Sequence, residues 1–207
     1  MQVIAVLVLL LIICVVCPSA FARLGQQAPK REVASLADLV EDTLAFHFGD
    51  SKIPFNSLAD LANSYQVPEN LRKPAGVFVT LSRNGKTRAC WGSVTADYPN
   101  LVSATIYTTE AALNKEYRFP KIKRGEYALL KPQVTVVRDI RPLTSIRGQN
   151  PMLFGLLVRA GGRAGVILPG EASDAYYQMV LAKLKAGIKP KQPCQMYRIK
   201  ADVFKRN

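Results

Sequence analysis

The strongest local signal in the chain is a pair of strands joined by a tight turn. The apolar run Gly76–Leu81 is followed by Arg83-Asn84-Gly85-Lys86 and then by Thr87–Trp91. Asn-Gly between two strand-like runs is typical of a two-residue hairpin, because both turn positions need a positive φ. The pattern therefore predicts an antiparallel β-ribbon over residues 76–91.

A second ribbon is predicted later in the chain, where Leu153–Val158 and Ala164–Leu168 flank Gly161-Gly162. These glycines do not form a nucleotide-binding loop, because a strand rather than a helix follows them and the spacing fits neither nucleotide fingerprint. Alternating, β-branched sequence predicts two further strands, over Gln133–Val137 and Met196–Phe204.

Helical periodicity and capping residues predict the remaining elements. Gly49 and Gly187 are placed to end the first and last helices, and Pro120 cannot continue a helix. We therefore expect an α+β fold, an antiparallel β-sheet with flanking helices, with room for a smaller second lobe. The helices are predicted from Ser35 to Gly49, from Ser57 to Tyr65, from Asn100 to Lys115 and from Asp174 to Gly187.

The N-terminal segment does not belong to this domain. The uncharged apolar run Val3–Val16 is followed by Ala20-Phe21-Ala22, the small-x-small pattern of a signal-peptidase site. We expect a signal peptide over residues 1–22, a flexible segment over 23–33 and the domain over 34–205. An uncleaved membrane anchor is the alternative, although the run is short for a full span.

The net charge of the chain indicates which class of binding partner it favours after export. Residues 1–22 carry no charged side chain, so cleavage leaves the formal net charge of +13 unchanged. Such a balance favours an anionic small molecule, peptide or envelope component as partner. Export to the periplasm or the medium removes the chain from most nucleic acid, so none is expected as a partner. The cleaved chain is expected to have no stable membrane span.

Few residues are available for metal or redox chemistry. Cleavage leaves two cysteines, Cys90 and Cys194, and their spacing alone does not decide whether they form a disulfide. His47 is the only histidine, which excludes a histidine-rich zinc site. We expect neither a metal nor a cofactor.

Taken in order, several blocks of the sequence resemble the AMMECR-type domain family. The resemblance runs from about Leu36 to Phe204, and it implies an α+β domain that binds or modifies other molecules, without an agreed reaction. The blocks are Gly76–Leu81 with Arg88-Ala89-Cys90-Trp91-Gly92, Ala111-Ala112 with Arg118-Phe119-Pro120, Gln133–Val137 with Pro142-Leu143, Gly155–Val158 with Gly162–Pro169, and Lys185-Ala186-Gly187.

Cys90 is the candidate catalytic residue. Alternation along a strand would place Arg88 on the same face, where its charge would lower the pKa of the thiol. The missing base would have to be His47, Glu110 or Glu116. The alternative is that Cys90 is a small buried core residue, as unpaired cysteines often are.

Two hypotheses do without a nucleophile. In a binding module, Arg88, Arg118 and Arg163 would line one anion-binding cleft, with Trp91 as a stacking wall. In an interaction protein without a pocket, the basic stretch 183–206 would be the docking surface. We expect a cleft near Cys90 that binds a small or peptide-like anionic ligand.

Cleavage is testable in a secreting bacterial host. We expect the exported chain to begin at Arg23 by intact-mass measurement, because signal peptidase selects small residues at the two positions that Ala20 and Ala22 occupy. The variant A20D should keep residues 1–22. A wild-type chain that retains Met1 and stays with the membrane would instead establish the anchor.

Overall fold

The computed structural model describes residues 30–206. The predicted signal peptide, and residues 23–29 of the segment predicted to be flexible, lie outside this part. Within it, no helix has the length and apolar character needed to cross a bilayer. Arg31 belongs to the segment predicted to be flexible, yet it forms a β-bridge with Tyr65 and an ion pair of 2.7 Å with Asp42.

One antiparallel sheet holds the described chain together. Its strand order is β2-β1-β3-β6-β4-β5, so the first and second hairpins lie at opposite ends of the sheet. The predicted α+β fold is confirmed. The strands are β1 (Val77–Arg83), β2 (Lys86–Gly92), β3 (Lys131–Leu143), β4 (Phe154–Ala160), β5 (Arg163–Ile167) and β6 (Gln195–Lys205).

The helices begin where the sequence places their caps. The Ser35 side chain accepts a hydrogen bond from the Asp38 amide, and Asn100 and Asp174 cap their helices in the same way. The elements are α1 (Leu36–His47), α2 (Leu58–Asn63), α3 (Glu69–Arg72), α4 (Leu101–Asn114), the 3₁₀-helix η2 (Arg124–Leu129) and α5 (Ala175–Lys185).

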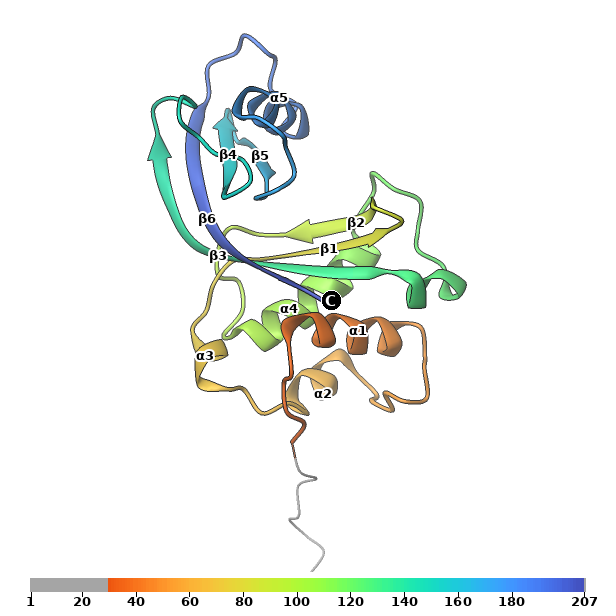
Figure 1. The fold of residues 1–207 in the computed structure, drawn as a ribbon. Helices are drawn as coiled ribbons and strands as arrows, with labels where there is room; N and C mark the ends of the chain where they lie inside the picture. Colours follow the sequence, from red (N-terminus) through yellow and green to blue (C-terminus); the bar gives the residue numbers. More distant parts are fainter. Residues whose placement is uncertain (1–29, 207) are drawn as a thin grey trace, which may run out of the picture.

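Two long strands, β3 and β6, run through both halves of the molecule (Figure 1). Their pairing shifts register between Val137 and Asp139, which leaves Arg138 as an extra residue in β3. Such a bulge bends a strand and increases its twist. The sheet curls beyond this point, so that β4, β5 and α5 form a smaller lobe above β1 and β2 (Figure 1).

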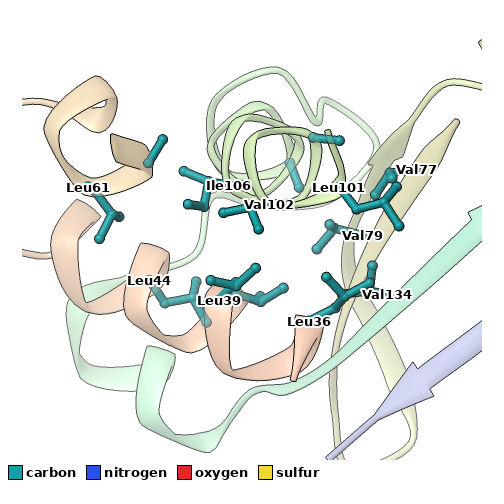
Figure 2. Packing of buried hydrophobic residues seen from close by; sticks show 14 of the residues in the cluster. Leu36, Leu39, Leu44, Leu61, Val77, Val79, Leu101, Val102, Ile106 and Val134 are labelled. Atoms are coloured by element: carbon teal, nitrogen blue, oxygen red, sulfur yellow. The ribbon is translucent and has the colours of Figure 1, made fainter. Parts of the chain in front are cut away.

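Each lobe has its own hydrophobic core. In the larger lobe, α1 and α4 cover one face of β1 and β3, and α2 packs against these two helices. Leu36 of α1 and Leu101 of α4 lie beside Val77, Val79 and Val134 of the sheet (Figure 2). In the smaller lobe, Leu156 and Ile167 pack against Ala182 of α5. A third cluster, which includes Phe78 and Ile199, lies between them. Each lobe is therefore stabilised by its own core, and the third cluster joins the two lobes.

Helix α5 approaches β5 closely at Gly165. A Cβ atom built at Gly165 would lie 2.1 Å from the Ala182 carbonyl oxygen and 3.0 Å from the Ala186 Cβ. Because Ala182 belongs to α5 and Ala186 caps its C-terminal end, only glycine allows this contact without moving the helix.

We expect G165A to lower the free energy of unfolding by about 1–3 kcal/mol, the usual cost of forcing a methyl group into a packed contact. Urea unfolding measures this. The matched control is G125A, because a Cβ at Gly125 meets nothing within 4 Å. Equal stability of the two variants would contradict the close contact.

Candidate functional site between the two lobes

A β-bulge separates Arg88 from Cys90. Leu81 pairs with Ala89, but the next residue of β1, Ser82, pairs with Thr87, so Arg88 is an extra residue in β2. Arg88 forms an ion pair of 2.8 Å with Glu126. It lines a small hollow on the α4 side of the sheet. The prediction that Arg88 and Cys90 share one face is therefore wrong, because the bulge interrupts the alternation of the strand.

On the outer side of β2, where no further strand follows, two side chains hold the backbone of Cys90. β2 is an edge strand, and the Cys90 amide donates to the Glu116 carboxylate at 3.1 Å. Arg118 Nη2 donates to the Cys90 carbonyl oxygen at 2.9 Å. Glu116 and Arg118 also form an ion pair with each other. We call these two residues the edge clamp, because they satisfy the outward-facing backbone groups of β2.

The carboxylate of Glu116 is buried, with 3% of its side chain exposed. Burial, the largest single effect, raises its pKa. Hydrogen bonds from the Arg118 side chain, the Arg118 amide and the Cys90 amide outweigh burial and lower the pKa of Glu116 to about 2. A carboxylate of such low basicity is a poor proton acceptor at neutral pH, so Glu116 is not suited to activate the thiol.

The other candidate bases do not lie beside the thiol. His47 Nδ1 lies 3.0 Å from the Glu110 carboxylate, which ties α1 to α4 in the helical layer. Neither residue lines the hollow that contains Cys90. His47 is therefore placed for the structural role of a hydrogen bond between helices, and Cys90 has no imidazole partner among the described residues.

Burial also raises the pKa of the Cys90 thiol, and the hydroxyl of Thr80, which donates to Sγ at 3.4 Å, offsets only part of this effect. The thiol is therefore protonated at neutral pH, and a protonated thiol is a weak nucleophile. Cys194 lies at the edge of the core of the smaller lobe, and both cysteines are free.

Two adjoining hollows form a cleft between the lobes. The first, about 440 Å³, lies over Thr80 and Gln133 of the sheet. The second, about 260 Å³, is lined by Cys90 and Arg118. Lys185 of α5 lines both, so we treat them as one interlobe cleft. The curl of the sheet creates this cleft, because it brings β5 and α5 opposite β1 and β2.

The charged lining of the cleft is mostly cationic. Arg118, Lys185 and Lys205 come from three separate segments, and Glu171 is the carboxylate among them. Lys185 lies 3.2 Å from Glu171 and donates to the Val166 carbonyl oxygen at 3.1 Å. The ammonium group of Lys205 makes no hydrogen bond or ion pair within residues 30–206, so its charge is available to a ligand.

The structure brings three of the five predicted site residues to this cleft: Cys90, Arg118 and Trp91. Trp91 is half-buried and also packs against the core of the larger lobe. Arg88 lies on the other side of the sheet, as described above. Arg163 lies elsewhere, because it donates to the Gly187 carbonyl oxygen beyond the end of α5 and lines a separate, open hollow of about 1010 Å³.

Sequence reasoning missed Thr80 and Glu171, and it included Lys185 and Lys205 only in the basic stretch 183–206 and not in a cleft. Lys185 lies in one of the blocks that carry the family resemblance, and this was the available signal. Lys205 precedes Arg206 at the end of the last strand, and the register of β6 against β3 places it beside Gln133. In the described part of the chain, no group of three or more His, Cys, Asp or Glu side chains could hold a metal ion.

The edge clamp should make stability depend on pH. The pKa of Glu116 falls from 4.5 to about 2 on folding, so its contribution is complete above about pH 5 and is lost as the pH falls towards 2. We expect wild type to lose roughly 2–3 kcal/mol of unfolding free energy over this range that E116Q does not lose.

Urea unfolding at pH 7 and pH 3 measures the difference. The control is E69Q, which removes the exposed carboxylate paired with Arg72, and its pH dependence should parallel that of wild type. An E116Q variant whose stability falls with pH as steeply as that of wild type would show that the clamp carboxylate is not stabilised.

Comparison with known proteins gives this architecture its family. The AMMECR1 family model matches residues 45–207. A Thermotoga maritima protein is 33% identical over 144 residues, covering 67% of this chain and 83% of its own length. A Methanothermobacter thermautotrophicus protein is 30% identical over 152 residues, covering 67% and 79%.

The crystal structure of the uncharacterised protein PH0010 from Pyrococcus horikoshii has the same fold. Its TM-score is 0.67 at 24% identity, over 83% of this chain and 89% of that one. The names of these relatives state no activity. With a family match that spans most of its length, the chain belongs to the AMMECR1 family.

Proposed function

We propose that this protein binds a small anionic ligand, or an acidic group of a peptide, in the interlobe cleft. The observation that carries the proposal is the convergence of Arg118, Lys185 and Lys205 on adjoining hollows that share Lys185. Carboxylate and phosphate groups are the natural partners of such a set. Thr80, Ser82 and Gln133 add polar groups on the floor that can orient a ligand.

Two of the three cations keep donors for a ligand. Arg118 uses Nε and Nη2 for Glu116 and Cys90, and its Nη1 has no hydrogen-bond partner in the described chain. Lys205 is exposed and unpaired there. Lys185 is shared with Glu171, so an incoming anion would compete with that carboxylate. Competition of this kind favours ligands with more than one negative charge.

Binding without turnover is better supported than catalysis by Cys90. The thiol has a raised pKa, and Glu116, whose carboxylate accepts from the Cys90 amide, has a lowered one, which is the opposite of an activated pair. The interaction protein without a pocket is less well supported, because the cations converge on a concave surface. We also propose that the protein acts in the periplasm or outside the cell, on the basis of the predicted signal peptide.

Titration with inorganic phosphate, citrate and a tetra-aspartate peptide tests the proposal by calorimetry and by chemical shifts. We expect citrate and the peptide to bind more tightly than phosphate. K205Q should weaken binding by roughly tenfold, the usual effect of one charged hydrogen bond. K200Q is the matched control, because Lys200 is an exposed lysine of the same strand outside the cleft lining.

The variant C90S separates binding from thiol chemistry. We expect it to bind the same probes within about threefold of wild type, because the cations supply the affinity. Loss of a catalysed reaction of any probe in C90S, with binding retained, would instead support the cysteine-dependent enzyme. Equal weakening by K205Q and K200Q would show that the probes respond to net charge and not to the cleft.

A further inference from the structure

Helix α5 exposes an apolar stripe to solvent. Tyr176, Val180 and Leu184 follow one another at a spacing of four residues, and Tyr177 lies beside them, so all four share one side of the helix. Tyr176 and Leu184 are each 73% exposed. The opposite side of α5 buries Gln178 and Ala182 against the lobe. An outward face of a surface helix is normally polar, so this stripe needs an explanation.

The smaller lobe carries further exposed apolar side chains besides the stripe. Met152 and Leu153 are 61% and 62% exposed, on a loop next to α5. The buried side of α5 holds this loop, because Gln178 Nε2 donates to the Phe154 carbonyl oxygen at 2.9 Å. Six of the nine exposed large hydrophobic residues in the described part therefore lie in the smaller lobe. Such a gathering is typical of an interaction surface.

The charge of the smaller lobe selects the partner. Residues 144–194 contain seven lysines and arginines but two acidic residues. Lys189 and Lys191 are exposed directly after α5. Tyrosines, a leucine and flanking lysines are the composition with which helices lie on the surface of an anionic bilayer. α5 also lies on the outside of its lobe, at the end of the molecule away from α2 (Figure 1).

From these observations we propose that the exposed face of α5 docks the protein onto an anionic lipid surface. Tyr176, Tyr177, Val180 and Leu184 enter the interface between headgroups and acyl chains, while Lys189 and Lys191 contact the headgroups. The proposal concerns the chain after the predicted cleavage, without residues 1–22. The described chain begins beside α2, at the end of the molecule away from α5 (Figure 1).

Vesicle co-sedimentation tests the proposal with the chain that begins at Arg23, which retains all three hydrophobic clusters. We expect binding when about a third of the lipid is phosphatidylglycerol, and little binding to phosphatidylcholine alone. The double variant Y176S/L184S should weaken binding by roughly tenfold or more, because both side chains are exposed and their loss leaves the core intact.

Y117S/L129S is the matched control, because it removes an exposed tyrosine and an exposed leucine from the larger lobe. It should bind as wild type does. For the charges, K189Q/K191Q should bind more weakly than K52Q/K73Q, which removes two exposed lysines of the larger lobe. Equal loss in each variant and its control, or no binding by wild type, overturns the proposal.

Sedimentation velocity without lipid tests the alternative that a second copy of the chain covers the stripe. A wild-type dimer that Y176S/L184S converts to a monomer, with no lipid binding by either, would show that a second copy of the chain covers this face. That result would also overturn the proposal. Because neither measurement involves a ligand of the cleft, the outcome is independent of the proposed anion binding.

Discussion

The pairing of β3 with β6 is the interaction on which the rest of the structure depends. These two strands are the only ones in the described chain that extend through both lobes, and they join the hairpin β1–β2 to the hairpin β4–β5. The bulge at Arg138 bends the paired strands β3 and β6 partway along their length, so their two halves run in different directions within one continuous sheet. The cleft exists because the two hairpins are carried by a single bent ladder and not by separate domains.

The edge clamp shows how the fold handles the exposed end of its sheet. An edge strand presents unpaired amide and carbonyl groups that could pair with another chain. At Cys90 a carboxylate and a guanidinium take the place of the missing strand, one accepting and one donating. The arrangement also fixes the Arg118 side chain at the wall of the cleft. Protection of the edge and placement of a candidate binding group are therefore achieved by the same pair.

Local signals in the sequence predicted most of the elements. Asn84-Gly85 has the positive φ values of the expected turn, and the capping residues begin their helices where the pattern placed them. The site was predicted only in part. The bulge that moves Arg88 to the helical side follows from a register between strands, which alternation within one strand does not contain. The convergence of Lys185 and Lys205 depends on the curl of the whole sheet, which joins residues far apart in sequence.

Helix α5 contributes to two separate surfaces. Its last turn carries Lys185, which lines the cleft, and its outward side carries the apolar stripe. A helix of eleven residues is short and rigid, so a tilt that moves Lys185 relative to Glu171 also moves Leu184, its neighbour in the chain. Ligand binding in the cleft and docking of the stripe on a lipid surface would then both depend on the position of α5. Linkage makes such an effect reciprocal: a ligand that strengthens docking by some factor is itself bound more tightly, by the same factor, by the docked protein.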